Sequence, residues 1–181
     1  MRTLLFVVLV VLSGAGALAG PSDAKLELKN PRYLEKGVVT GGQPSAEDLV
    51  RLREQGIKTV INLRGQGEVT KHADPKIAER FNYPEDEIVK SFGMNYFHIP
   101  VSSKDGLTPE NAKLLDEALK AAGDGVLVHC GSGNRVGAMM ALRAFHVQGK
   151  EAEEALAIGK AAGLTSLEPR VRDLLSLPAA E

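Results

Sequence analysis

The sequence of 181 residues is poor in several features that often identify a class of protein. It has one cysteine, no tryptophan and a formal net charge of only −1 at pH 7. This near-neutral charge, without basic runs or interleaved aromatic residues, argues against nucleic-acid binding. The sequence also lacks internal repeats and low-complexity tracts. With 44% hydrophobic residues, it has the composition of one globular domain with an extra segment at its amino end.

That extra segment has the pattern of a secretory signal peptide. Arg2 supplies a positive start, residues 4–12 form an unbroken apolar run, and Ala17-Leu18-Ala19 matches the small-x-small pattern before a cleavage point. We therefore predict a signal peptide over residues 1–19, cleavage after Ala19, and a periplasmic or secreted protein. An uncleaved anchor is the alternative, but the apolar run is short for a membrane span of about 20 residues. No stable membrane span is expected once the signal is removed.

Export makes the single cysteine unusual, because exported proteins usually pair their cysteines in disulfides. Cys130 follows the apolar run 126–128 and opens a loop that continues through Gly131, Ser132, Gly133 and Asn134 to Arg135. The glycines permit positive φ, so the N–H groups of residues 131–135 can turn inward toward an anion. The dipole of the following helix and the charge of Arg135 both favour a thiolate. The pattern predicts a thiol nucleophile facing an oxyanion, with a buried structural cysteine as the alternative.

Strand and helix patterns alternate along the rest of the chain. After a polar, flexible leader over residues 20–31, a domain is predicted over residues 32–178. Strands are predicted over residues 33–39, 57–63, 94–101 and 126–128. Helices are predicted from a capping box at Ser45 to Gly56, over 84–92, from a cap at Thr108, and over 136–148, 151–162 and 168–175. This alternation predicts an α/β fold with three layers, in which helices flank a short, mostly parallel sheet.

Three segments of the chain together resemble a known family. His129-Cys130, the short loop and Arg135 resemble the signature of the protein tyrosine and dual-specificity phosphatase superfamily. Gly42-Gln43-Pro44-Ser45 and residues 59–64 resemble a bacterial branch of it, the phosphatase-like domain that is fused to metallo-β-lactamase-type hydrolases or stands alone. The resemblance covers most of residues 33–175. It implies a cysteine-phosphatase fold, no metal or organic cofactor, and hydrolysis of a phosphomonoester through a thiophosphoryl-enzyme intermediate on Cys130, with residues 131–135 binding the phosphate.

The loop differs from the superfamily signature by one residue. Four residues rather than five separate Cys130 from Arg135, so the loop has one inward N–H fewer to hold a phosphoryl group. The same spacing resembles single-domain rhodaneses, which carry sulfur as a persulfide on the thiol. The rhodanese segment Gly-His-Ile-Pro-Gly is only partly matched, because Val101 follows residues 98–100. A non-catalytic anion-binding or redox-sensing domain is the third alternative.

A phosphatase of this type also needs a carboxyl group that protonates the leaving oxygen. The resemblance implies that this acid follows the third strand, where Asp105 lies. Lys104-Asp105-Gly106 is equally an ordinary turn sequence. Glu68 and Asp86 are weaker candidates for the acid.

Two further residues are expected to support the site. By the resemblance, His129 orients the loop by hydrogen bonding and does not react. Arg64 follows a buried strand and is either a second cation of the site or a solvent-facing or salt-bridged arginine. Residues 131–134 contain no lysine or arginine, which favours a phosphomonoester of modest charge. The expected substrate is a phosphorylated protein or a small phosphomonoester.

Overall fold

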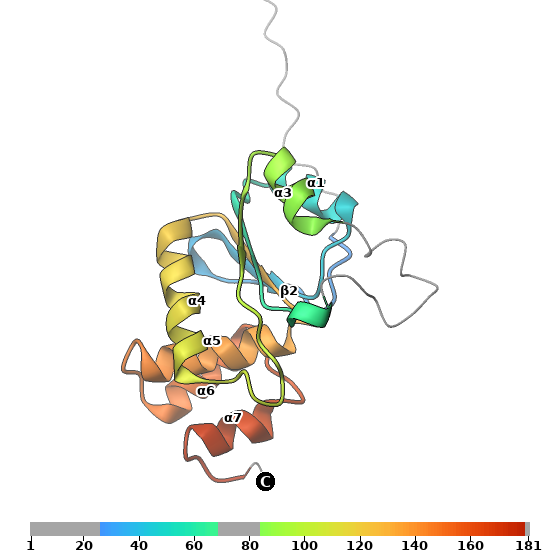
Figure 1. The fold of residues 1–181 in the computed structure, drawn as a ribbon. Coiled ribbons are helices and arrows are strands. Elements are labelled where there is room, and N and C mark those ends of the chain that lie inside the picture. Colours follow the sequence, from blue (N-terminus) through green and yellow to red (C-terminus); the bar gives the residue numbers. More distant parts are fainter. Residues whose placement is uncertain (1–25, 69–83, 180–181) are drawn as a thin grey trace, which may run out of the picture.

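The computed structural model describes residues 26–68 and 84–179 of the chain (Figure 1). The predicted signal peptide and its cleavage point lie outside the described residues, as do residues 20–25 of the predicted leader. Within the described residues, no helix combines the length and the hydrophobicity that are needed to cross a membrane.

A five-stranded sheet forms the centre of the described part of the chain. Its strands are β1 (Arg32–Tyr33), β2 (Val38–Gly41), β3 (Thr59–Asn62), β4 (Asn95–His98) and β5 (Val126–His129). They lie in the order β1-β2-β5-β3-β4, with β1 antiparallel to β2 and the other neighbours parallel. The prediction of a short, mostly parallel sheet is therefore confirmed. The strand that leads to Cys130 is the central one, and all of its residues are buried.

Helices cover both faces of the sheet, which confirms the predicted three layers. One face packs against α4 (Pro109–Ala122), α5 (Asn134–His146), α6 (Ala152–Ala161) and α7 (Glu168–Leu174), and the other against α1 (Ala46–Glu54) and α3 (Glu85–Ser91). Figure 1 shows α1 and α3 side by side, away from the other four helices. Neighbouring strand residues point to opposite faces. Accordingly, Val128 joins the core beneath α5, whereas Leu127 joins the core beneath α1.

The predicted helix starts are confirmed at two caps. At α1, the Ser45 hydroxyl accepts from the Asp48 N–H at 3.1 Å, and the Asp48 carboxylate accepts from the Ser45 N–H at 3.1 Å. At α4, the Thr108 hydroxyl accepts from the Asn111 N–H at 3.3 Å, and a proline follows the cap. These contacts satisfy backbone donors that a helix leaves unpaired in its first turn. The capping sequences therefore identified both helices correctly.

The prediction of one strand over residues 33–39 is wrong. A short 3-10 helix, η1 (Glu35–Gly37), separates β1 from β2. Lys36 and Gly37 have φ values of 57° and 67°, in the left-handed region that no strand residue adopts. Two successive left-handed residues turn the chain, so β1 runs antiparallel to β2 instead of continuing it.

Part of the segment predicted as a leader packs against the domain where the structure describes it. Leu26 and Leu28 are buried in the same hydrophobic cluster as Leu49 of α1. The Glu27 N–H between them donates to Asp48 Oδ1 at 2.9 Å. The alternation of leucine with charged residues is that of an extended segment with one buried face. The packed domain therefore begins no later than residue 26.

Candidate active site

The loop that follows β5 lies at the carboxyl end of the parallel strands. Cys130 comes directly after β5, and α5 begins at Asn134. Gly41 at the end of β2 and Asn62 at the end of β3 are both paired in register with His129 at the end of β5. Open α/β sheets bind their ligands at this edge. The structure therefore brings the predicted loop residues 130–135 to the position where such a fold places its site.

The Cys130 thiol is held at the base of this loop. Its side chain is 1% exposed, and its N–H donates to the Gly41 carbonyl at 3.2 Å. The Gly133 N–H donates to Cys130 Sγ at 3.2 Å. Gly133 has a φ of 88°, and a side chain there would also lie 3.4 Å from the backbone of Gly41. Glycine therefore permits the turn that aims this amide at the sulfur, and a charged sulfur accepts such a bond more strongly than a neutral one.

The distant stretch that begins at Gly42 lies directly against the loop. Gly42 pairs with Ser132 in an isolated antiparallel bridge, and Asn30 Nδ2 donates to the Ser132 carbonyl at 3.1 Å. A Cβ at Gly42 would lie 2.8 Å from Lys29 Cβ and 3.1 Å from the Gly131 carbonyl oxygen. The loop therefore takes its shape partly from residues that precede it by about 90 positions in the sequence.

Asn134, which the sequence predicts to bind phosphate, uses its side chain elsewhere. Its Oδ1 accepts from the Thr165 N–H at 2.8 Å and the Leu167 N–H at 3.3 Å, and its Nδ2 donates to Ser166 Oγ at 2.7 Å. These bonds hold the connection between α6 and α7 against the start of α5. A contribution of Asn134 to anion binding is therefore left to its backbone N–H.

Arg135 lies over the loop, where Glu68 and the Val101 carbonyl hold its guanidinium. Its Nη1 donates to Glu68 Oε1 at 2.7 Å and to the Val101 carbonyl at 2.9 Å, and its Nη2 donates to Glu68 Oε2 at 2.5 Å. Three of the five guanidinium N–H groups are thus engaged. Within residues 26–68 and 84–179, the other two, on Nε and Nη2, have no oxygen partner; they share one edge of the planar group and are parallel donors for an oxyanion. A Cβ built on Gly131 would lie 3.6 Å from Nη2, which places this edge beside the loop.

The ion pair between Glu68 and Arg135 is reflected in the acidity of both groups. The hydrogen bond from Arg135 lowers the pKa of Glu68, against the effect of partial burial. Burial alone would lower the pKa of Arg135, but the Glu68 carboxylate and Cys130 raise the pKa of Arg135 above its usual value. Glu68 is therefore held as a carboxylate and Arg135 as a cation. A carboxylate in this state is a poor proton donor, which weighs against Glu68 as the general acid.

Arg64, the expected second cation, is buried at the end of β3 beside this pair. Its Nη2 donates to the backbone carbonyl of Glu68, at the end of the 3-10 helix η2 (Gln66–Glu68). Its own carbonyl contacts His98 Nε2 at 2.7 Å. Arg64 therefore holds the segment that carries Glu68. It lies close enough to contribute to the lowered pKa of that carboxyl.

His129 takes part in a buried polar network on the other face of the sheet. Its Nε2 lies 2.9 Å from Glu85 Oε1, and both side chains are buried. Asn62 Nδ2 lies 3.0 Å from the same carboxylate oxygen and 2.9 Å from Tyr96 Oη. Burial would raise the pKa of Glu85, but the contact with His129, assisted by Arg64, lowers it. The network ties α3, β3 and β4 to the strand that leads to Cys130, and a role of His129 in orienting the loop stays a prediction.

The sequence does not predict the contact of Glu85 with His129. For Glu68 it predicts a general acid and not the ion pair with Arg135. Glu85 opens a correctly predicted helix, but no local pattern connects it with His129, 44 residues away. Glu68 precedes Arg135 by 67 residues, and the sequence predicts it only as a weaker candidate for the general acid. Asn62, a polar residue at the end of a strand with an apolar centre, is a local sign of a polar network there.

The predicted acid Asp105 lies in an exposed turn after β4. The turn ends at Gly106. A side chain at this position would not fit, because its Cβ would lie 2.3 Å from the Ser102 nitrogen. The same segment begins at Val101, whose carbonyl binds Arg135. Asp86, the other weak candidate, lies on α3 and pairs with Lys90 at 3.0 Å, a contact that lowers the pKa of Asp86. Asp105 therefore remains the predicted acid.

Comparison with known proteins adds to this geometry. Residues 31–146 match the family described as "Beta-lactamase hydrolase-like protein, phosphatase-like domain". The chain is 26% identical over 130 residues to the beta-lactamase hydrolase-like protein of Xylella fastidiosa, an alignment that covers 72% of this chain and 28% of that protein. The chain therefore spans little more than a quarter of the length of this relative.

Solved structures share the fold at lower identity. The protein nma1982 of Neisseria meningitidis Z2491 superposes with a TM-score of 0.60 and 21% identity, covering 78% of this chain and 96% of that one. Kinase associated phosphatase, solved with its catalytic site cysteine replaced by serine, superposes with a TM-score of 0.56 and 15% identity, covering 85% and 98%. The fold is thus that of the protein tyrosine and dual-specificity phosphatases.

Proposed function

The chain belongs to the family of phosphatase-like domains of the beta-lactamase hydrolase-like proteins, and from this premise we propose that it hydrolyses phosphomonoesters with Cys130 as the nucleophile. The observation that carries the proposal is the pairing of two features at the carboxyl end of β5. Cys130 Sγ accepts an amide N–H from its own loop, and, within the described part of the chain, Arg135 has two parallel donors without an oxygen partner beside the same loop. One group suits attack on phosphorus, and the other suits the oxygens around it.

In the first step, Cys130 Sγ forms a bond to phosphorus while the bond from phosphorus to the ester oxygen breaks. Arg135 and the loop N–H groups hold the non-bridging oxygens as their charge is redistributed. Asp105, in its protonated form, gives its proton to the leaving oxygen. The products of this step are a free alcohol or phenol, a thiophosphoryl group on Cys130 and an ionised Asp105.

In the second step, a water molecule attacks phosphorus. Asp105 accepts a proton from this water as the new bond forms and the sulfur–phosphorus bond breaks. Inorganic phosphate leaves, the Cys130 thiolate is restored, and Asp105 is again protonated. The cycle uses one water and needs no metal or organic cofactor.

Family membership favours phosphate over sulfur as the group that is transferred. A rhodanese would instead carry a persulfide on Cys130, and its substrate thiosulfate is also an oxyanion. The four-residue spacing suits either reaction, whereas the match over residues 31–146 is to a phosphatase-like domain. The expected substrate is a phosphorylated protein side chain or a small phosphomonoester.

The proposal is tested by hydrolysis of p-nitrophenyl phosphate. We expect Cys130→Ser to abolish turnover and Arg135→Ala to lower kcat/KM roughly 100-fold to 1,000-fold, as loss of a main oxyanion donor does. Arg170→Ala is the matched control, because Arg170 is exposed on α7 and far from the loop in sequence. Rapid acid quench and mass spectrometry should find one phosphoryl group on Cys130.

The alternatives give different results in the same preparation. Thiocyanate formation from thiosulfate and cyanide, without phosphate release, would assign the chain to sulfur transfer. Absence of both activities, with a Cys130 that still reacts with iodoacetamide, would assign a non-catalytic anion-binding or redox role.

We also propose that the mature protein is periplasmic or secreted. The basis is the signal-like pattern of residues 1–19. Expression of the full chain followed by cell fractionation should recover it outside the cytoplasm, with a mature amino terminus at Gly20. Recovery in the cytoplasm with residues 1–19 intact would contradict this location.

A further inference from the structure

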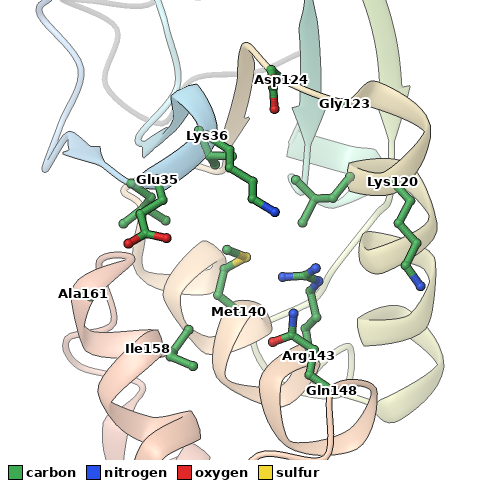
Figure 2. Close-up of a pocket in the computed structure, with 13 residues that line it drawn as sticks. Glu35, Lys36, Lys120, Gly123, Asp124, Met140, Arg143, Gln148, Ile158 and Ala161 are labelled. Carbon is green, nitrogen blue, oxygen red and sulfur yellow. The ribbon is translucent and has the colours of Figure 1, made fainter.

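We propose that the domain carries a second binding site, for a small amphipathic anion, at the end of the sheet opposite to Cys130. The site is a hollow of about 690 Å³ bounded by η1 and by helices α4, α5 and α6 (Figure 2). Sites for small organic molecules typically measure roughly 300–1,000 Å³. The hollow is therefore large enough for a whole ligand of this size.

The position of the hollow separates it from the proposed active site. Its lining includes Lys36 in η1, Val38 at the start of β2 and Asp124 just before β5. Cys130 and Gly42 follow the opposite ends of the same two strands. The inference goes beyond the proposed function, because a ligand in the hollow would not touch the reacting atoms.

The inner surface of the hollow is mainly apolar. It is formed by side chains that belong to the core or pack against it, namely Leu34, Val38, Leu119, Met140 and Ile158. Figure 2 shows the Met140 thioether and Ile158 on the floor. Aliphatic side chains bind the hydrocarbon part of a ligand, and a flexible methionine adapts to its shape.

Two cations enter this apolar hollow from opposite walls. Figure 2 shows the Lys36 ammonium and the Arg143 guanidinium pointing toward one another across it. Within the described residues, the Lys36 ammonium has no ion pair. Arg143 bonds Asp116 at 2.8 Å, but Lys120 bonds the same carboxylate at 2.7 Å, so one buried anion balances two cations. The hollow therefore has positive charge that a bound anion would neutralise.

The acidic residues of the lining lie outside the space between the two cations. Figure 2 shows the Glu35 carboxylate turned away from the two cations and Asp124 at the rim. A carboxylate, sulfonate or phosphate head group between Lys36 and Arg143, with an aliphatic or aromatic body on the apolar floor, satisfies both parts of the surface.

The turn that carries Lys36 has an uncommon backbone conformation. Lys36 has φ 57° and ψ 30°, a left-handed conformation that is unfavourable for lysine. Gly37 follows at φ 67°, and a Cβ there would lie 3.3 Å from the Gly125 nitrogen, so the turn is packed against the start of β5. Backbone conformations of this kind concentrate at binding sites. The turn holds Lys36 at the hollow rather than on a free loop.

The test compares octanoate with octan-1-ol, which has the same carbon chain without the charge. In protein labelled with ¹³C at methionine methyls, octanoate should shift the Met140 signal in a saturable manner. The Met94 signal should not move, because Met94 is buried on the other face of the sheet. Octan-1-ol should bind about fivefold more weakly than octanoate, because it lacks the charge that forms a partly exposed ion pair with Lys36.

Variants identify the contact that causes this difference. Lys36→Gln should raise the Kd for octanoate about fivefold and leave that for octan-1-ol unchanged. Lys104→Gln removes the same charge from an exposed turn at the other end of the sheet and should change neither value. Cys130→Ser should bind octanoate as the unmodified protein does, so this test and the phosphatase assay can fail independently.

Three outcomes would overturn the proposal. They are an unchanged Met140 signal up to millimolar octanoate, equal affinities for octanoate and octan-1-ol, and full displacement of octanoate by inorganic phosphate in a manner that requires Arg135. The last result would place the ligand in the catalytic loop instead.

Discussion

Glu68→Gln is the most informative single substitution for the active site. Glu68 holds two N–H groups of Arg135, on Nη1 and Nη2, and does not itself occupy the edge formed by Nε and Nη2. If this carboxylate positions Arg135 for substrate, replacing it with an amide should weaken both phosphate binding and turnover. If it instead competes with substrate for Arg135, the same change should strengthen phosphate binding. The two roles predict opposite signs.

The expected size of the effect follows from the two bonds that Glu68 makes. A hydrogen bond to a charged group contributes roughly 1.5–3 kcal/mol when it is well shielded. The Glu68 side chain is 45% exposed, so solvent screens much of this contribution. We take about 1.4 kcal/mol for the pair, which corresponds to about a tenfold fall in kcat/KM.

The measurement is kcat/KM for p-nitrophenyl phosphate, together with the inhibition constant of inorganic phosphate. Glu87→Gln is the control, because Glu87 is an exposed acid on α3 and its loss changes the net charge equally. We expect a tenfold loss with Glu68→Gln and none with Glu87→Gln. Tighter inhibition by phosphate with undiminished kcat/KM would refute the positioning role.

Three further predictions test other parts of the molecule. Asp105→Asn should remove the fall of kcat/KM toward high pH that reports a general acid, and an unchanged pH profile would exclude Asp105 from that role. Glu85→Gln should destabilise the fold by about 2 kcal/mol at pH 7, because it weakens a buried contact with His129. Since folding lowers the pKa of Glu85, this stabilisation is present above the ordinary carboxyl pKa of about 4.3 and is lost as the pH falls through the lowered value. Urea unfolding at pH 7 and pH 3 should therefore show a smaller difference from wild type at pH 3, and a constant difference would contradict the linkage. Gly137→Ala should cost about 2–3 kcal/mol by overpacking, because its Cβ would lie 2.0 Å from the Leu164 nitrogen, and thermal denaturation against Gly67→Ala, which faces open space, checks this.

The elements that were predicted well have local signals. A capping box spans Ser45 to Asp48, and both partners lie within one turn of the helix they start. The strand before Cys130 is a continuous apolar run, as expected for a buried parallel strand. Its central position in the sheet gives the loop two flanking strands.

The elements that were missed depend on distant partners or on conformation. Lys36 carries no sequence sign of a left-handed backbone. The sequence therefore predicts one continuous strand where the chain turns between β1 and β2. Leu26 and Leu28 looked like isolated apolar residues in a polar leader. Their burial arises only because α1 presents Leu49 to them in the folded protein.

The residues of the candidate active site also fall into those with local sequence signals and those that depend on distant partners. Cys130 and Arg135 are close in sequence, so the loop alone is enough to predict a role for each of them. The carboxylates that hold Arg135 and His129 lie 67 and 44 residues away from them. The chain contains 23 acidic residues, and only the order of the strands decides which of them reach the loop. The sequence therefore predicts the groups that we propose to react, and it does not predict the carboxylates that bind Arg135 and His129.

The bridge between Gly42 and Ser132 means that the length of the loop over residues 130–135 is constrained by a second segment, residues 29–42. A fifth residue inserted between Cys130 and Arg135 would shift Ser132 away from Gly42 and from the side chain of Asn30. The space beside Gly42 is already filled by Lys29 and Gly131, so the displaced loop has no room on that side. A longer loop grafted from a related enzyme would therefore have to bring its own counterpart of residues 29–42. In this protein, the length of the loop is therefore coupled to the packing of residues 29–42.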